Sequence, residues 1–414
     1  SHIGENLHNG QVQTLAEALN RDVTLITVDP RFSVPAGKSK HWLPIKPGTD
    51  MALLLSWMHV LIEEDLYDKD YVERYTVGFE QLADHVRAYT PEWVYLETGI
   101  RPEVIRETAR EMAKAAPATI VHPGRHATWY GDDTQRSRAI AMLNALLGSW
   151  NRKGGFYIPE SVDLPDYPLP AYPEPEHRTA DAYPGKWPFA SQGVTNGVID
   201  ASIGDDAFFK GWLIYGTNLP QTIPGIEQKL REAADSLELV VVVETMPSEV
   251  TGYADVILPE CTYLERYDEL RNSGERAPSL ALRMPAFEPQ GESKPGWWMA
   301  KQLASRLGLD EYFPWDDFSE KLDWQLREVG SSLAEMQKIG VKNFPRKTPL
   351  YFREGERVQF RTPSGRIELY SQQLSEKGFD PMPVYTPPDP VPQGFYRLNY
   401  GRMPAHTFGK TTNN

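Results

Sequence analysis

Apolar runs of strand length alternate with segments of helical spacing over the first third of the chain. Val23–Val28 and Ala118–Val121 are rich in β-branched residues and predict strands, and Trp42–Ile45 predicts another short extended segment. Thr49 stands where a helix N-cap would lie, and the helix that follows should bury one apolar face. The apolar spacing predicts helices over residues 9–20, 51–62, 103–115 and 134–147.

Prolines interrupt this pattern from residue 159 to residue 188, and their spacing excludes a helix or a central strand there. The alternation resumes with predicted strands at Gly211–Tyr215 and Leu239–Val243. Strands and helices that alternate at this length predict an α/β fold with parallel sheets. Later segments predict helices over 225–234, 297–308 and 317–336, a second proline-rich linker over 381–392 and a strand over 396–400.

Two stretches carry the same features in the same order. Gly4-Glu5-Asn6 precedes a helix and a strand that ends at Asp29, and Gly216-Thr217-Asn218 precedes a helix and a strand that ends at Glu244. A small loop between a strand end and a helix can receive a phosphate through its backbone N–H groups. The acid follows the first glycine by 25 residues in one copy and 28 in the other, near the roughly 20 of the ribose-binding acid in dinucleotide folds. The repeat favours two Rossmann-like nucleotide-binding lobes, with ordinary βαβ turns as the alternative.

Composition and charge exclude several other classes. The 414 residues suffice for two or three cores. A net charge of −14 without a block of Lys and Arg argues against nucleic acid as a partner. The longest apolar run, Ala52–Ile62, is too short to cross a bilayer. Cys261 is the only cysteine and is expected to be a buried structural thiol, which excludes a disulfide framework or a cysteine-based metal site in this chain.

Seven further motifs occur along the chain in this order: Val28–Arg31, Pro47–Asp50, Leu66–Asp68, Tyr75–Glu80, Ala139–Gly148, Ala254–Pro259 and Thr362–Glu368. Together they resemble the dimethyl-sulfoxide-reductase family of molybdopterin oxidoreductases over essentially the whole chain. His122–His126, Trp129–Gly131 and Gly401–Thr407 are most similar to the polysulfide and thiosulfate reductase branch. The resemblance implies a molybdenum centre held by bis(molybdopterin guanine dinucleotide).

The resemblance also implies which residues hold the two nucleotides. One set is Gly4, Asn6, Asp29, Arg31 and Asp50, and the other is Gly216, Asn218, Glu244, Thr245 and Asp255. A carboxylate suits guanine because it accepts hydrogen bonds from both N1–H and the exocyclic amine. The alternative for Asp50 is a first-turn acid that favours the helix dipole.

Residues near the chain end are implied to begin a C-terminal β-barrel-type cap domain that touches the pterins: Arg402, His406, Thr407, Thr412 and Asn413. Arg125 and His126 are the candidate catalytic residues, since they would attract a sulfur anion and supply a proton as a sulfur–sulfur bond is cleaved. Alternatively, the histidines of this loop bond backbone groups. His122 and His126 have no third ligand nearby in sequence, so a metal site there is disfavoured.

The expected domains are a first α/β lobe over 1–118, a second over 119–310 with an excursion at 159–188, a helical linker region over 311–380 and the start of the cap domain over 381–414. The chain begins without a Met, and both ends are interpreted as cuts in an internal fragment. The molybdenum's protein ligand and a 4Fe-4S cluster would then lie in a preceding domain.

The expected function is that of a catalytic subunit of a periplasmic respiratory reductase for polysulfide or thiosulfate. Its expected partners are an iron–sulfur electron-transfer subunit and a membrane subunit that handles quinone. Alternatives are an arsenic-oxyanion reductase, a formate dehydrogenase or a non-catalytic scaffold subunit of a redox complex. A nicotinamide dehydrogenase is disfavoured because the G-x-G-x-x-G loop is missing.

Overall fold

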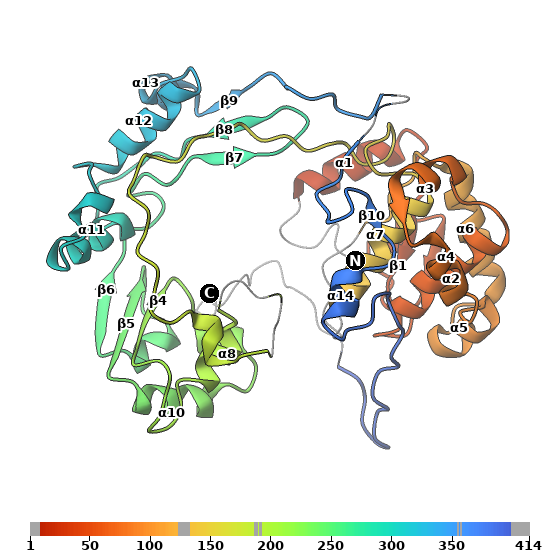
Figure 1. The fold of residues 1–414 in the computed structure, drawn as a ribbon, viewed down its shortest axis with the longest axis horizontal. Coiled ribbons are helices and arrows are strands. Elements are labelled where there is room, and N and C mark those ends of the chain that lie inside the picture. Colours follow the sequence, from red (N-terminus) through yellow and green to blue (C-terminus); the bar gives the residue numbers. More distant parts are fainter. Residues whose placement is uncertain are drawn as a thin grey trace. The chain divides into compact units, whose positions relative to one another are not determined.

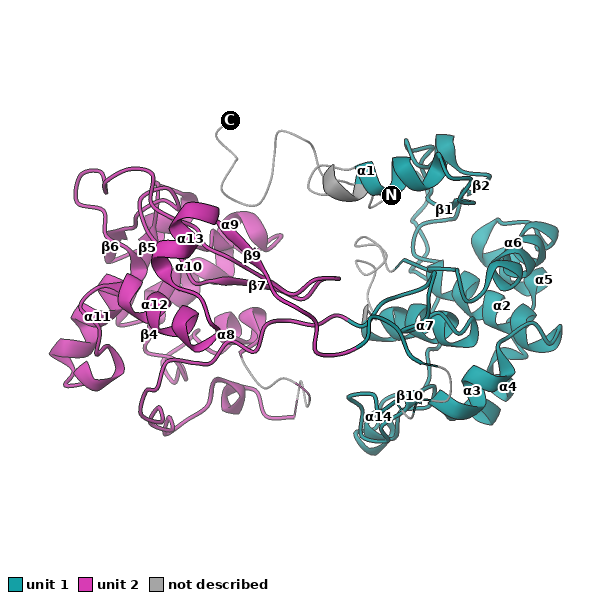
Figure 2. Ribbon diagram, turned by 90° about the horizontal axis from the view of Figure 1, so that it is seen from above, with its two compact units in different colours: residues 1–158, 349–404 teal, residues 159–348, 405–414 magenta. Residues whose placement is uncertain are grey.

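The computed structural model describes residues 9–122, 133–185, 189, 193–353, 356 and 358–398. The chain forms two compact units, coloured separately in Figure 2. Unit 1 takes residues 1–158 and 349–404, and unit 2 takes residues 159–348 and 405–414. Most of unit 2 is therefore an insertion within the sequence of unit 1.

The described part of unit 1 is mainly helical and holds two short parallel strand pairs (Figure 1). Strand β1 (Ile26–Val28) pairs with β2 (His41–Leu43), and β10 (Ile367–Glu368) pairs with β3 (Thr76–Val77). Its described helices are α1 (Asn9–Leu19), η1 (Ala36–Lys38), α2 (Asp50–Glu63), α3 (Lys69–Tyr75), α4 (Phe79–Val86), α5 (Pro91–Thr98), α6 (Pro102–Ala115), α7 (Asp133–Leu146) and α14 (Gln372–Glu376).

Helix α2 lies at the centre of the unit 1 core. The predicted single buried face is wrong, because every residue from Met51 to Met58 is buried, as are Val60 and Leu61. Helices α4, α5, α6 and α7 all contact it, and a helix that is apolar on every side needs such cover. Thr49 lies at the N-cap position, as predicted. The Thr49 hydroxyl makes no cap bond and donates instead to the Lys46 carbonyl at 2.7 Å.

The chain returns from unit 2 at residue 349 and completes unit 1. Strand β10 continues into Leu369, whose N–H donates to the Val77 carbonyl at 3.0 Å. Gly78 has φ +85°, and a Cβ there would lie 2.6 Å from the Cβ of Tyr370. The glycine thus permits both the left-handed turn and the close approach of the returning segment.

The first residues of the predicted linker over 381–392 are bound to the helices of unit 1. Arg138 on α7 donates to the Pro381 carbonyl at 3.0 Å, and the His85 ring on α4 bonds the Pro383 carbonyl at 2.7 Å. Side chains of unit 1 therefore fix the path of the chain up to about this point.

The described residues of unit 2 form two three-stranded sheets. The parallel sheet has the order β4 (Gly211–Tyr215), β5 (Leu239–Glu244), β6 (Val256–Pro259), and the antiparallel sheet has the order β7 (Arg271–Ser273), β8 (Ser279–Ala281), β9 (Val341–Asn343). Its described helices are η3 (Thr179–Ala182), α8 (Thr195–Asp200), α9 (Leu219–Thr222), α10 (Glu227–Ser236), η4 (Glu249–Tyr253), α11 (Gly296–Arg306), η5 (Asp310–Tyr312), α12 (Phe318–Glu328) and α13 (Leu333–Ile339).

Each sheet of unit 2 has its own apolar core. Ile214, Val240 and Val242 of the parallel sheet pack with Ile199 of α8 and Leu230 of α10. The antiparallel sheet packs through its central strand β8 against α12 and α13. These two cores and the α2 core are consistent with the sequence expectation of two or three.

Several predicted elements differ in the structure. Residues 118–121 form no strand, because the side chain of Asn144 pairs with both the N–H and the carbonyl of Val121, each at 2.9 Å. The first strand is shorter than predicted and begins at Ile26. The helix predicted over 317–336 is two helices, separated at Gly330 with φ +72°. Residues 396–398 are not in a strand, and 399–400 lie outside the described residues.

Candidate functional site

The acids predicted for the first nucleotide lie at the carboxyl edge of the β1–β2 pair. Asp29 directly follows β1 and is only 4% exposed. Its Oδ1 accepts from the Arg31 N–H at 2.9 Å, and its own N–H donates to the Leu43 carbonyl at the end of β2, at 3.2 Å. This local turn fixes the carboxylate at the strand end.

Asp50 follows β2 by one turn and begins α2. Burial raises the pKa of Asp50, and the positive charge of Arg136 on α7 acts against that rise. Arg136 is only 4% exposed, and charged groups are rarely buried this far without a partner. The sequence analysis missed Arg136, and the sequence holds no clear sign of it, because α7 also carries Arg138 and other polar residues.

The second predicted set centres on the carboxyl edge of the β4–β5–β6 sheet. Gly216 follows β4 with φ +62°, and its N–H donates to the Val243 carbonyl at 3.0 Å. Glu244 ends β5 and is 3% exposed. Its Oε1 accepts from the N–H of Thr245 at 2.8 Å and from the Thr245 hydroxyl at 3.2 Å. The structure therefore brings Gly216, Glu244 and Thr245 to adjacent strand ends, as expected.

Asn218 lies at the same edge, but its side chain faces inward. Its Nδ2 donates to Glu249 Oε2 at 2.6 Å, and its Oδ1 accepts from the Val250 N–H at 3.2 Å. The side chain is 1% exposed. Asn218 thus holds the loop after β4 against η4. The helix that follows, α9, is a single turn, so the long helix expected to begin at this loop comes only with α10.

The structure does not bring Asp255 to this edge, which corrects its predicted grouping with Gly216 and Glu244. Asp255 precedes β6, and in a parallel sheet the residue before a strand lies at the amino edge. Its Oδ2 accepts from the Val240 N–H at 2.7 Å, and its own N–H donates to the Val240 carbonyl at 2.9 Å. Asp255 therefore ties β6 to the start of β5, a strand's length from Glu244.

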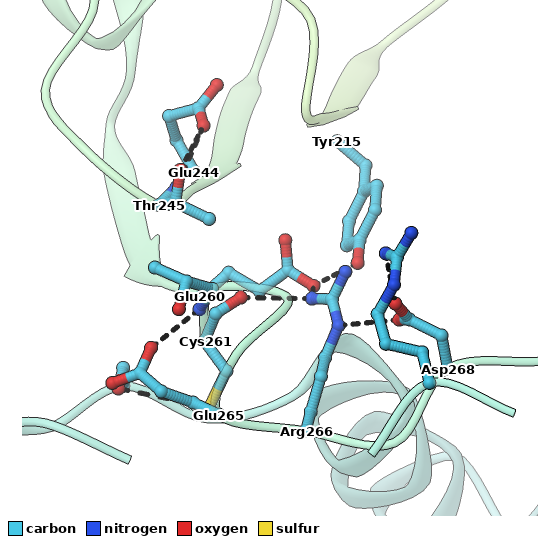
Figure 3. A network of polar contacts seen from close by, with 11 residues as sticks. Tyr215, Glu244, Thr245, Glu260, Cys261, Glu265, Arg266 and Asp268 are labelled. Atoms are coloured by element: carbon cyan, nitrogen blue, oxygen red, sulfur yellow. Dashed lines mark hydrogen bonds and ion pairs between the residues drawn. The ribbon is translucent and has the colours of Figure 1, made fainter. Parts of the chain in front are cut away.

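A polar network that the sequence analysis missed occupies the carboxyl edge beside Glu244 (Figure 3). Glu260, the residue after β6, accepts from the Tyr215 hydroxyl and from Arg266. Arg266 Nε also donates to Asp268 Oδ1 at 2.8 Å, and Arg283 Nη1 donates to Asp268 Oδ2 at 2.7 Å. Glu260 stands directly after a strand, as Asp29 does, and Glu244 is the last residue of one; this position was the sign in the sequence.

Cys261 is fully buried, as predicted. Burial raises the pKa of its thiol, and its Sγ lies 3.8 Å from the Ser293 hydroxyl oxygen. Across the ranges that the structure describes, no three His, Cys, Asp or Glu side chains gather as a metal-ligand group. Within the same ranges, no helix has the length and apolar composition needed to span a bilayer.

The remaining predicted site residues lie outside the described residues: Gly4, Asn6, Arg125, His126, Arg402, His406, Thr407, Thr412 and Asn413.

The residues that are described fit the nucleotide ends of a large cofactor. Asp29 and Glu244 are buried carboxylates at strand ends, each anchored by a neighbouring N–H. Ribose hydroxyls and the guanine N–H groups are donors, which such acceptors match. The left-handed Gly216 lets the backbone turn sharply next to Glu244.

Comparison with known proteins gives a consistent picture. The sequence model of the family "Molybdopterin oxidoreductase" matches residues 3–306. The molybdopterin-containing subunit PhsA of thiosulfate reductase from Salmonella typhimurium is 33% identical over 99% of this chain and 59% of its own length. The dimethyl sulfoxide reductase DmsA from Escherichia coli is 28% identical over 88% of this chain and 51% of its own length.

A solved structure, the acetylene hydratase from Pelobacter acetylenicus, superposes with a TM-score of 0.76 at 28% identity, over 93% of this chain and 57% of that one. The chain thus spans between half and three fifths of the length of these relatives. The strand-end acids, the mixed α/β fold with parallel sheets and the family match over residues 3–306 agree, and the chain belongs to the molybdopterin oxidoreductase family.

Proposed function

We propose that this chain is the cofactor-binding core of the catalytic subunit of a molybdenum-dependent respiratory reductase. The proposed reaction is the two-electron reduction of an inorganic sulfur compound, polysulfide or thiosulfate, at a bis(molybdopterin guanine dinucleotide) centre. The observation that carries the proposal is the buried acid at the carboxyl edge of a parallel sheet in each unit, Asp29 and Glu244. The likeness to a thiosulfate reductase subunit supports the sulfur substrate.

Each Rossmann-like lobe is proposed to hold one guanine dinucleotide. Asp29, Arg31 and Asp50 would hold the first, with Gly4 and Asn6. Gly216, Glu244 and Thr245 would hold the second, while Asn218 shapes the loop from within. When bound, the molybdenum centre would supply the electron pair exchanged with the substrate. The chain's own part is to fix the two nucleotide ends in place.

Burial disfavours the ionised form of Asp50, as the raised pKa records. Guanine N–H donors would favour that ionised form, because they bond the carboxylate. The positive charge of nearby Arg136 also favours the ionised form of Asp50. Nucleotide binding would therefore lower the pKa of Asp50.

Other parts of the sequence interpretation remain proposals of the same kind. Arg125 and His126 would meet the substrate anion, and Arg402, His406, Thr407, Thr412 and Asn413 would contact the pterins from a β-barrel-type cap domain. A membrane quinone subunit and an iron–sulfur subunit on the periplasmic side would pass electrons to a 4Fe-4S cluster in a preceding domain. The domain limits at residues 118, 310 and 380 belong to this proposal.

The first test measures cofactor content. The full-length protein should contain molybdenum and release two guanine nucleotides per molybdenum on acid treatment. Glu244→Gln should lower the nucleotide content toward one, because an amide N–H replaces an acceptor that faces guanine or ribose. Asp255→Asn is the matched control at the opposite edge of the sheet and should retain both nucleotides. A wild-type protein without guanine nucleotide would refute the proposal.

The second test separates the substrates. Acetylene hydratase is similar in sequence and structure, so family membership alone does not decide the reaction. The full-length enzyme should oxidise a reduced viologen dye with thiosulfate or polysulfide, and not with dimethyl sulfoxide, arsenate or carbon dioxide. Acetylene should not be hydrated. Turnover of any other compound in preference to the sulfur anions would contradict the proposed substrate.

A further inference from the structure

The charged network around Arg266 contributes no group to the proposed nucleotide contacts, although it is built into the same edge of the sheet. We infer that Arg266 is a positioning residue that acts through Glu260 and Tyr215 to fix the Gly216–Asn218 loop. The inference rests on the proposed function, since this loop belongs to the second nucleotide site.

The bond between Tyr215 and Glu260 joins the two outer strands of the sheet. Tyr215 is the last residue of β4, Glu260 follows β6, and β5 lies between those strands. Neighbouring strands are about 4.8 Å apart, so the outer strands stand roughly 10 Å apart. The phenol and the carboxylate together bridge that distance across the end of β5 (Figure 3).

Arg266 is what allows Glu260 to serve as a charged acceptor. The Glu260 side chain is almost fully buried, and a buried carboxylate is unfavourable without a partner. Arg266 bonds this carboxylate, the Cys261 carbonyl at 3.1 Å and Asp268 at 2.8 Å. The guanidinium thus locks the turn after β6 and holds Glu260 toward Tyr215.

The Tyr215 ring also lies against the start of α11. Gly296, the first residue of α11, lies so close that a Cβ there would be 2.6 Å from the Tyr215 hydroxyl oxygen. Burial, and then the bond to Glu260, raise the pKa of Tyr215 to about 12. The phenol therefore stays protonated near neutral pH and remains a donor to Glu260.

The loop between Tyr215 and Asn218 is consequently fixed at both ends. The Glu260 contact holds its start, and Asn218 holds its end through Glu249 and Val250. A loop that is already ordered loses less conformational freedom when a ligand binds. Removing the contact at the start should therefore weaken nucleotide retention without removing any atom that touches the nucleotide.

The test compares Tyr215→Phe, Glu260→Gln and Arg266→Met in the full-length protein. Tyr312→Phe is the matched control, because its hydroxyl bonds a backbone carbonyl elsewhere in unit 2, that of Ala171 at 2.9 Å. Amide hydrogen exchange of residues 216–222 is measured in cofactor-free protein, and guanine nucleotide per molybdenum is measured in loaded protein. Arg266→Lys serves as a conservative variant that retains the charge.

Each of the three variants should speed exchange in the loop by about tenfold, a typical cost of one charge-assisted hydrogen bond. Exchange in β5 and α10 should not change, whereas a general loss of unit 2 stability would speed it there too. The double variant Tyr215→Phe with Arg266→Met should match the larger single effect, because both act through Glu260. Arg266→Lys should recover part of the protection, and Tyr312→Phe should behave as wild type.

Unchanged loop exchange in Tyr215→Phe and Arg266→Met would overturn the inference, as would additive effects in the double variant. Faster loop exchange with full nucleotide retention would also overturn it. A wild-type protein that lacks guanine nucleotide would instead overturn the proposed function, while the exchange pattern would still report on whether Arg266 orders the loop.

Discussion

The two units place a buried acid at the end of a parallel strand, but they support it in different ways. In unit 1, Asp29 and Asp50 lie beside a core in which α2 is enclosed by other helices, with Arg136 as a buried counter-charge. In unit 2, Glu244 lies beside a chain of charged and polar side chains that ties together the ends of the two outer strands, β4 and β6. Similar strand ends can therefore be stabilised mainly by apolar packing in one unit and mainly by side-chain hydrogen bonds in the other.

The difference has a physical basis in the size of each core. The α2 core of unit 1 is large and includes Leu43 of β2, so burial of apolar surface supports the strand ends there in addition to the local bonds of Asp29. The parallel sheet of unit 2 has a smaller apolar core, which α8 and α10 cover. Its loops then depend on directional contacts, which are sensitive to charge and pH. The following predictions test this contrast.

The largest effect should come from the core of unit 1. Leu55→Ala, at a fully buried position of α2, should lower the free energy of unfolding of unit 1 by about 3 kcal/mol, because it leaves a cavity. Leu96→Ala on α5 is the control, since Leu96 is 69% exposed and should cost little. Denaturant unfolding followed by hydrogen exchange would measure each unit separately. Equal destabilisation of both units would contradict their independent support.

A somewhat smaller effect is expected where the returning chain docks on unit 1. Gly78→Ala should cost about 2 kcal/mol, because alanine is strained at φ +85° and its Cβ would meet Tyr370 at 2.6 Å. Gly330→Ala is the matched control, with φ +72° but open space around the site, and should cost only the strain of about 1 kcal/mol. Thermal unfolding would compare the two. Similar losses would show that the Tyr370 contact is unimportant.

The smallest effect should be a pH dependence of unit 2. Bonds from Thr348, and from the Lys347 N–H, lower the pKa of Glu160 to about 2. A depressed carboxyl pKa adds stability above the pKa of the unfolded chain, and this contribution disappears as the pH falls through the folded value. Glu160→Gln should therefore lower the unfolding midpoint of unit 2 at pH 6 and much less at pH 2. The exposed Glu238→Gln should leave the midpoint near wild type at both pH values, and a Glu160→Gln deficit that grows on acidification would have the wrong sign.

The sequence by itself determined most of the local features: the majority of the helix and strand segments, the acids at the strand ends, the buried Cys261 and the family. These follow from periodicity and short motifs, which depend on neighbours along the chain. The position of Asp255 was within reach as well, because a residue that precedes a parallel strand lies at the amino edge of the sheet.

Only the tertiary structure decided which side chain, distant in sequence, forms a hydrogen bond or ion pair with each polar group. Asn144 replaces a strand partner for Val121, Asn218 turns inward to Glu249, and Arg266 holds Glu260 against Tyr215. These choices depend on the register of strands and on the packing of helices far apart in the sequence. A local pattern contains no information about that register, since the same acid after a strand can face a ligand or a buried arginine.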